Sequence, residues 1–356
     1  MKITNIEVKY PIYKDDLKDW RPKLWQIITK ISTNKKNIFG FGTGGGGNAS
    51  IEIINGHLGN LIINEEINNK QDIIKVFEKL YQHSIPYGRG GITSMAISSL
   101  DLALWDAFSK YYEIPIKSLL EENSEKHRNK IETYATGNNV KEYSNLSINN
   151  FKLSVRSSED FEKDFENLSK IISNTRESII NAKKLMLDCY MTWDLDYAKN
   201  MTSRLKDFNI EWIEDICTPD IILDNKFYDK NLFEIQIAGG EHELNHNNFK
   251  LMKNNNSYDI WQPDVTWCGG ISALLKIINI NSKKYKIILH RGGEPWGLPL
   301  IESGLVDNMA ELHNPKTNNL ELEQWNNKSI YAINNSFLKT NNYLGFGCVP
   351  IKELFS

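Results

Sequence analysis

Five strand-like runs between Leu185 and His290 each end on an ionisable residue, and this regular series limits the possible folds more than any other feature of the chain. Steps of 23 to 27 residues separate the terminal side chains, which are Asp188, Glu214, Glu241, Asp264 and His290. A step of this size holds one strand and one returning helix, the repeating unit of a parallel α/β barrel. Barrel enzymes keep their chemistry at the carboxyl ends of the strands, so the spacing predicts that all five side chains meet there.

The predicted fold is an α/β protein, a modified (β/α)8 barrel preceded by a smaller α+β domain. Two further strands before the series, at residues 131–135 and 151–155, and one after it, at 308–311, complete the eight. The stretch from about 131 to 325 is short for eight units. We therefore expect one abbreviated helix, in the segment Gly292–Gly297 that follows the seventh strand.

We divide the chain into residues 1–125, 126–325 and 326–356. The first 60 residues are rich in strand and turn signals and predict a small antiparallel sheet, with helices over residues 70–120. From Ala96 the apolar residues recur with a helical period and leave Asp101 and Lys110 off the stripe, which predicts a core-packing helix. The last segment, 326–356, is expected to pack back on the first domain.

A glycine-rich stretch spans Gly42–Asn48. It lacks the Lys-Ser/Thr pair of a phosphate-binding P-loop and the spacing of a dinucleotide fingerprint. Consecutive glycines leave the backbone free to move, so we predict a mobile flap here.

Composition narrows the range of partners and compartments. The apolar and charged contents, 40% and 24%, are ordinary for a globular protein, and a net charge of −3 gives no reason to expect nucleic acid or an anionic membrane. No apolar run approaches the roughly 20 residues that span a bilayer, and the N-terminus lacks the apolar core of a signal peptide. The four cysteines include no Cys-x-x-Cys pair, so we expect free thiols and a cytoplasmic protein.

Asp188, Glu214 and Glu241 end three successive strands and therefore form a candidate metal site. Three unpaired carboxylates at one place repel each other and raise each other's pKa, and a divalent cation relieves this. All-oxygen ligation favours a hard ion such as Mg²⁺ or Mn²⁺. Taken singly, each acid could instead cap a helix or form a salt bridge.

Asp264 and His290 end the next two strands and predict a general base. A carboxylate beside an imidazole holds its tautomer and supports its protonated form. A metal beside such a base suits the removal of a weakly acidic proton next to a carboxylate, because the metal stabilises the developing charge.

Six motifs spread over both predicted domains resemble the mandelate racemase-like branch of the enolase superfamily, and within it the L-rhamnonate dehydratase-type acid-sugar dehydratases. They are Ser99–Asp106, Tyr134–Gly137, Met186–Cys189, Trp212–Asp215, Gly240–Glu243 and Gln262–Gly270. The use of a Lys or His base with Mg²⁺ is already known for that superfamily.

The resemblance implies roles for individual residues. Asp188, Glu214 and Glu241 are then the Mg²⁺ ligands, and His290 with Asp264 is the base. Glu311, at the end of the eighth strand, is expected to help hold the substrate or the intermediate as part of the catalytic set, and His242 to lie near the substrate. The first domain becomes a capping domain whose loops, around Arg21 and Gly42–Asn48, close over the substrate; Arg21 is either a substrate contact or a solvated surface residue.

The second strand departs from part of that family. Many racemases carry Lys-x-Lys there, whereas this chain has Lys152, Ser154 and Arg156 at the alternating positions. Racemisation needs proton transfer on both faces of the carbon, so a chain with one clear base favours dehydration. Lys152 is expected in the catalytic set, and Ser154 and Arg156 near the substrate. Trp296 either stacks on the substrate or packs the rim of the barrel, and we count it with the substrate-binding residues.

The implied reaction is the Mg²⁺-dependent dehydration of an aldonic acid to a 2-keto-3-deoxy acid, by α-proton abstraction and an enediolate. L-Rhamnonate, fuconate, gluconate, galactonate, xylonate and arabinonate are the candidate acid sugars. The alternatives are a racemase or epimerase of the same superfamily, or a non-catalytic binding protein on the same scaffold. A homo-oligomer is expected from the resemblance.

Overall fold

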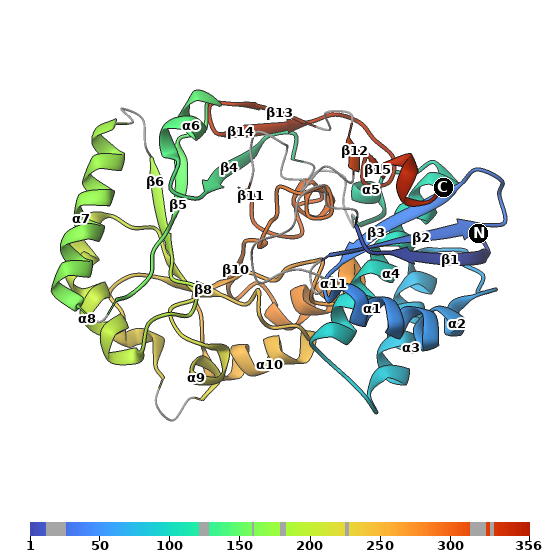
Figure 1. Cartoon of the computed structure of the whole chain (residues 1–356), viewed down its shortest axis with the longest axis horizontal. Coiled ribbons are helices and arrows are strands. Elements are labelled where there is room, and N and C mark those ends of the chain that lie inside the picture. Colours follow the sequence, from blue (N-terminus) through green and yellow to red (C-terminus); the bar gives the residue numbers. More distant parts are fainter. Residues whose placement is uncertain are drawn as a thin grey trace.

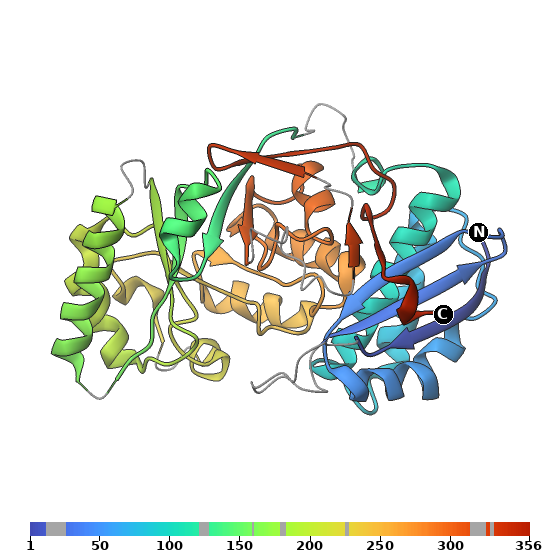
Figure 2. The same cartoon turned by 45° about the horizontal axis from the view of Figure 1, so that its top comes forward.

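The computed structural model describes residues 1–11, 26–120, 128–158, 160–178, 183–224, 228–313, 325–327 and 331–356. The parallel strands occupy the left and centre of Figure 1, and the N-terminal sheet with its helices lies on the right. Both chain termini lie beside that N-terminal sheet (Figures 1 and 2).

The N-terminal unit is a three-stranded antiparallel sheet followed by helices, as the turn and strand signals predict. Strands β1 (Ile3–Lys9), β2 (Ile27–Thr33) and β3 (Phe39–Gly44) pair in the order β1-β2-β3. The helices are α1 (Gly47–Ile53), the π-helix η1 (Ile54–Leu58), α2 (Gly59–Ile62), α3 (Lys70–Ser84), α4 (Ile92–Tyr112) and α5 (Ile116–Leu120).

Helix α4 is a core-packing helix, as the apolar stripe predicts, and most residues off the stripe are buried as well. It packs on β2 and β3 on one side and on helix α11 (Gly270–Asn281) of the barrel on another. Asp101, expected off the buried face, is 1% exposed, and its Oδ2 accepts a hydrogen bond of 3.1 Å from the amide of Ser272. Small residues and serines fill much of the side off the stripe, because this helix is covered by both units.

The glycine run does not form the predicted mobile flap. Residues 42–47 are buried: the first three end strand β3, and Gly47 begins α1. A side chain at Gly42 would overlap the carbonyl oxygen of Ser99, and one at Gly44 the carbonyl oxygen of Met95, both in α4. The glycines therefore allow close packing of strand on helix.

Eight parallel strands form the barrel and match the five predicted from the spacing and the three predicted on either side of that series. They are β4 (Ile131–Thr136), β5 (Asn150–Ser154), β6 (Lys184–Asp188), β7 (Ile213–Glu214), β8 (Ile237–Gly239), β9 (Ile260–Trp261), β10 (Lys286–Ile287) and β11 (Met309–Leu312). They follow one another in order from β4 to β10, and β11 pairs with β4. The amide of Asp307, just before β11, lies 2.9 Å from the carbonyl oxygen of Ile287 and closes the circle.

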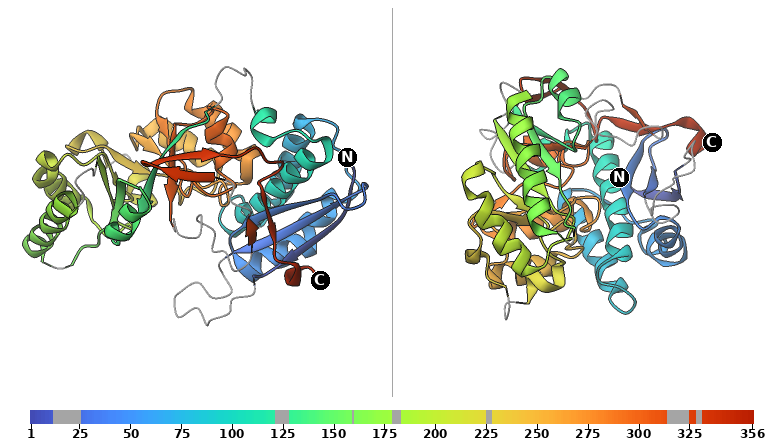
Figure 3. Two further views of the ribbon diagram at one scale, coloured as in Figure 1. Left: turned by 90° about the horizontal axis from the view of Figure 1, so that it is seen from above. Right: turned by 60° about the vertical axis from the view of Figure 1, so that its left-hand side comes forward.

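The connecting helices lie outside the strands (Figure 3). They are α6 (Val140–Asn145), α7 (Phe161–Ser178), α8 (Leu195–Leu205), α9 (Pro219–Leu223), α10 (His246–Asn255), α11 and α12 (Leu298–Glu302), with short 3₁₀ turns at Lys206–Phe208 and Lys230–Leu232. Helix α12, which follows the seventh barrel strand, has only 5 residues. The expected abbreviated unit is present, but other units are as short, since α9 has 5 residues and α6 has 6.

The C-terminal segment contacts both units. Strands β13 (Tyr331–Asn334) and β14 (Phe337–Thr340) form a hairpin that pairs antiparallel with β4, whereas β12 (Trp325–Asn327) pairs with β15 (Cys348–Pro350) ahead of a 3₁₀ turn at Lys352–Leu354. The amide of Phe346 donates to Asp106 of α4 over 2.9 Å. The domain boundaries given above remain a proposal.

All four cysteines are free and buried, as the prediction of free thiols requires. Burial raises the pKa of each thiol, to about 12 for Cys217. Among the described residues, no helix is both long and apolar enough to cross a membrane.

Candidate active site

The register of the barrel sheet brings several predicted residues to one level at the carboxyl ends of the strands. Ser154 of β5 pairs with Asp188 of β6, and Asp188 pairs with Glu214 of β7. Glu311 lies in β11, on the other side of β4. Because the strands are parallel and adjacent, these side chains face a common centre, which we call the barrel mouth.

Lys152 is the cation at this centre. Its side chain is fully buried, and Nζ lies 2.7 Å from Glu311 Oε1 and 3.4 Å from Asp188 Oδ2, with Glu214 as a third ion-pair partner. Burial disfavours the charged ammonium, but the attraction of these three acids outweighs it and holds the pKa of Lys152 well above its usual value. Lys152 thus stays protonated and joins strands β5, β6, β7 and β11.

Glu214 has further partners on its second oxygen. Oε2 accepts hydrogen bonds from Gln262 Nε2 at 2.6 Å and from Trp212 Nε1 at 3.2 Å. Burial, together with the neighbouring charge of Asp188, outweighs the attraction of Lys152 and raises the pKa of Glu214 to about 8. Three carboxylates, of Asp188, Glu214 and Glu311, surround the single ammonium of Lys152 and outnumber its positive charge.

The predicted dyad is formed in the structure. His290 Nδ1 lies 2.9 Å from Asp264 Oδ2, and Asp264 Oδ1 accepts from both the amide and the hydroxyl of Thr266 at 2.7 Å. Burial lowers the pKa of His290 in spite of Asp264. A neutral imidazole oriented by a carboxylate through Nδ1 leaves Nε2 able to accept a proton.

Glu241 lies between two histidines. Its Oε2 is 3.0 Å from His290 Nε2, and its Oε1 is 3.3 Å from His242 Nε2, which also contacts Asp215 Oδ2 at 3.3 Å. Burial and the charge of Asp215 raise the pKa of Glu241 well above its usual value. Burial lowers the pKa of His242, but the hydrogen bond and charge of Asp215 outweigh it and raise that pKa overall.

The three predicted metal ligands are not gathered into one compact set. Within the described part of the chain, the trios whose ligand atoms all lie within 4.8 Å are Asp215–Glu241–His242 and His290–Glu311–His313. Asp188 and Glu214 pair with Lys152, whereas Glu241 lies against His242 and His290. Burial, and after it the charge of neighbouring acids, raises the pKa of Glu214 and Glu241, and a hard cation bound by oxygen ligands would relieve the repulsion among these carboxylates. The assignment of Asp188, Glu214 and Glu241 as ligands stays a prediction.

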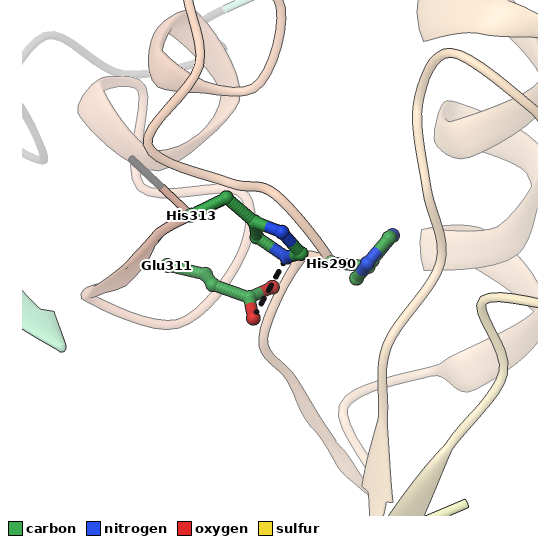
Figure 4. Close-up of side chains that lie close together, drawn as sticks. All are labelled: His290, Glu311 and His313. Carbon is green, nitrogen blue, oxygen red and sulfur yellow. Dashed lines mark ion pairs between the residues drawn. The ribbon is translucent and has the colours of Figure 1, made fainter. Parts of the chain in front are cut away.

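The sequence reasoning missed His313. It directly follows β11, and its Nε2 lies 3.2 Å from Glu311 Oε1 (Figure 4). Its ring stands edge-on to that of His290, with the centroids 5.3 Å apart. Polar residues at the carboxyl ends of barrel strands are candidates for the active site, and His313 meets this criterion. Asp215, which directly follows Glu214 at the end of β7, meets it too.

Of the predicted substrate-binding residues, Ser154 and Arg156 both lie next to Tyr190. The hydroxyl oxygens of Ser154 and Tyr190 are 2.7 Å apart, and the exposed guanidinium of Arg156 lies 5.4 Å from the Tyr190 ring, so these residues form one side of the mouth. Tyr190 follows β6 and was not singled out from the sequence. Arg21 lies outside the described residues.

Trp296 packs in the protein interior and does not line the substrate site, contrary to the prediction. It is 2% exposed and its ring packs against the rings of Trp325 and Phe346, each with a centroid distance of 4.9 Å. Trp267 lies nearer the mouth, with its ring 5.6 Å from that of His290 and 6.2 Å from that of His242.

Family models match both units of the chain. Residues 28–121 match the mandelate racemase / muconate lactonizing enzyme N-terminal domain, and residues 136–300 match the enolase C-terminal domain-like model. A protein of Caldivirga maquilingensis, named provisionally as an L-rhamnonate dehydratase, is 28% identical over 304 residues, which is 85% of this chain and 75% of that protein.

Solved structures share the fold over almost the whole chain. The L-rhamnonate dehydratase of Gibberella zeae superposes with a TM-score of 0.82 at 22% identity, covering 99% of this chain and 95% of that one. The same enzyme complexed with Mg gives 0.77 at 22% identity, with 93% and 81% covered. The 3,6-anhydro-D-galactonate cycloisomerase of Zobellia galactanivorans gives 0.81 at 24% identity, with 99% and 98% covered. This chain therefore belongs to the mandelate racemase / muconate lactonizing enzyme family of the enolase superfamily.

Proposed function

We propose that this protein is a Mg²⁺-dependent acid-sugar dehydratase, which removes water from an aldonic acid and yields a 2-keto-3-deoxy acid. The observation that carries the proposal is the buried His290–Asp264 dyad, whose Nε2 faces the acidic cluster of the mouth. The relatives named as rhamnonate dehydratases support this reaction class.

In this proposal the acids divide into two groups. Asp188, Glu214 and Glu241 hold Mg²⁺, which when bound neutralises charge that develops on the substrate carboxylate. The surplus of buried carboxylate and the Mg-complexed relative support this assignment. Glu311 keeps Lys152 in place, and Lys152 offers its ammonium to the substrate carboxylate from within the barrel.

His290 carries out the proton transfer in this proposal. Its Nε2 takes the proton from the carbon next to the substrate carboxylate, and Asp264 stabilises the imidazolium that forms. Ser154 occupies the strand position where many racemases of the family carry a second lysine, and its hydroxyl is paired with Tyr190. A single base supports elimination of the β-hydroxyl over inversion at the α-carbon.

A screen of the purified protein with Mg²⁺ tests the proposal. The panel is L-rhamnonate, fuconate, gluconate, galactonate, xylonate and arabinonate, and semicarbazide detects the 2-keto-3-deoxy product. We expect one acid to react and the reaction to disappear in His290→Asn. Deuterium incorporated with inversion at the α-carbon in D₂O, without water loss, would instead identify an epimerase or racemase. Silence across the panel without Mg²⁺ binding would favour a non-catalytic protein.

A further inference from the structure

Arg156 and Tyr190 form a rim of the barrel mouth, just beyond the strand ends at Ser154 and Asp188. Arg156 follows β5 and Tyr190 follows β6, and these two strands are neighbours in the sheet. The guanidinium carbon of Arg156 lies 5.4 Å from the centroid of the Tyr190 ring, and the hydroxyl oxygens of Tyr190 and Ser154 are 2.7 Å apart. The Tyr190 ring therefore connects Arg156 to the side of the mouth.

The backbone at Tyr190 has a conformation that residues other than glycine rarely adopt. Tyr190 has a φ of 50° and Met191 a φ of 59°, both in the left-handed region. The Tyr190 amide donates to Asp188 Oδ1 over 3.2 Å, and the Met191 amide donates to the carbonyl oxygen of Asp215 over 2.7 Å. Strain of this kind persists only where the surrounding structure fixes the residue. These contacts thus hold the Tyr190 ring, which is 39% exposed, at the mouth.

The exposed guanidinium of Arg156 forms no ion pair with an acid of the described part of the chain. Stacking on Tyr190 uses one face of the guanidinium and leaves its N–H edge available. Arg204 also stacks on a ring, that of Phe165 at 3.9 Å, but its edge donates to both oxygens of Glu162. Arg156 therefore has the aromatic support of an Arg–carboxylate site without the carboxylate.

Two cations of the β5 segment lie at different depths of the mouth. Lys152 is fully buried among the acids, whereas Arg156 is exposed at the rim. They are four residues apart, about 13 Å in a fully extended chain, and their long side chains shorten the distance between the charges. In the proposed function Lys152 binds the carboxylate next to the reacting carbon. A second cation further out suits a substrate with an acid group at each end.

We propose that Arg156, supported by Tyr190, binds a second carboxylate at the far end of the acid sugar. The preferred substrate is then an aldaric acid, and the matching aldonic acid is a poorer one. This inference rests on the proposed dehydratase function and concerns only the far end of the substrate. The planar edge of a guanidinium matches the two oxygens of a carboxylate. A methyl or hydroxymethyl end offers Arg156 no negative charge.

Matched pairs of acids test the proposal. Gluconate and glucarate, galactonate and galactarate, and xylonate and xylarate differ only in whether the last carbon is a hydroxymethyl group or a carboxylate. With Mg²⁺, we expect the purified enzyme to show a higher kcat/KM for the aldarate of the reacting pair. In Arg156→Gln the ratio of aldarate to aldonate kcat/KM should fall about 10- to 100-fold, as expected for loss of a hydrogen bond to a charged group. Arg156→Lys keeps the charge without the planar edge and should retain part of the ratio.

Controls separate the proposed role from a general effect of substitution. Arg204→Gln removes an arginine that also stacks on an aromatic ring but lies on α8, outside the mouth, so it should keep the wild-type ratio. Tyr190→Phe keeps the ring beside Arg156 and should keep the ratio as well. Tyr190→Leu removes the ring and should lower it.

Two kinds of result would count against the proposal. A wild-type enzyme that favours the aldonic acids, or an unchanged ratio in Arg156→Gln, would overturn the role of Arg156 and leave the dehydratase function intact. A wild-type enzyme silent on all three aldaric acids and on the whole aldonic acid panel would overturn the dehydratase proposal, and this inference with it.

Discussion

Lys152 Nζ and Glu311 Oε1 lie 2.7 Å apart in the fully buried centre of the barrel mouth, where they join the second strand of the barrel to the last. The contact is part of a larger group, because Lys152 also pairs with Asp188 and Glu214. One buried ammonium therefore holds acids from three other strands. Its removal would leave those carboxylates without a compensating charge inside the protein.

Replacing Lys152 with Met should destabilise the fold. Breaking a buried ion pair by removal of one partner costs about 3–5 kcal/mol, and we expect a loss of that order in the free energy of unfolding measured with urea. Lys75→Met is the control, because Lys75 forms an ion pair with Asp72 in α3 but is 72% exposed. Equal stability of the two variants would contradict the structural role of Lys152.

Replacing Asp264 with Asn should impair the base without disturbing the fold. The amide keeps the size of the side chain but no longer stabilises the imidazolium of His290. We expect kcat on the reacting acid to fall by about 10²-fold or more, with far-UV circular dichroism unchanged. Full activity in Asp264→Asn would show that His290 does not depend on its carboxylate partner.

Replacing Glu214 with Gln should weaken Mg²⁺ binding measured by isothermal titration calorimetry and abolish turnover. The substitution removes one of the three proposed anionic ligands while Gln262 and Trp212 remain as neighbours. Glu234→Gln, at an exposed position before β8, should bind Mg²⁺ like the wild type. Unchanged Mg²⁺ affinity in Glu214→Gln would remove Glu214 from the ligand set.

The stability of the interface between α4 and α11 should depend on pH through Asp101. Burial raises the pKa of this carboxyl to about 7 from 3.8, because the charged form is excluded from water. The folded state then binds the proton more tightly than the unfolded chain, so the contribution of Asp101 to stability is complete below about pH 4 and is lost as the pH rises to 7.

Asp101→Asn removes this titration. The free energy of unfolding of the variant, relative to wild type, should increase between pH 5 and pH 8. Glu113→Gln, at the exposed end of α4, should show no such trend. Parallel pH profiles for Asp101→Asn and the wild-type protein would mean that Asp101 is ionised in the folded state at pH 5.

The glycine run offers a steric prediction. Gly42→Ala places a methyl group against the carbonyl oxygen of Ser99, which is fixed in α4, and should cost about 1–3 kcal/mol of stability. In Gly56→Ala the added methyl meets nothing within 4 Å, so that variant should be as stable as the wild type or slightly more so. Thermal unfolding of the two variants checks this, and equal melting temperatures would argue against tight strand–helix packing.

Regular spacing along the chain was enough to predict the barrel, five of its strands and the approach of His290 to Asp264. These features follow from periodicity and from strand order, because parallel neighbours in a barrel bring their carboxyl ends together whatever the details of packing. The pattern of apolar residues likewise predicted α4, although not that most residues off its apolar stripe are buried too.

The remaining features depend on contacts between residues far apart in the chain, and only the tertiary structure decided them. Whether Gly42–Gly47 moves freely or is buried depends on α4, which lies some fifty residues further on. The partners of Lys152 are set by side-chain direction and sheet register, and Trp296 is buried because the C-terminal segment returns to cover it. Spacing alone cannot predict which of several acids a buried cation will contact, since that choice is made by distance, desolvation and charge in the folded interior.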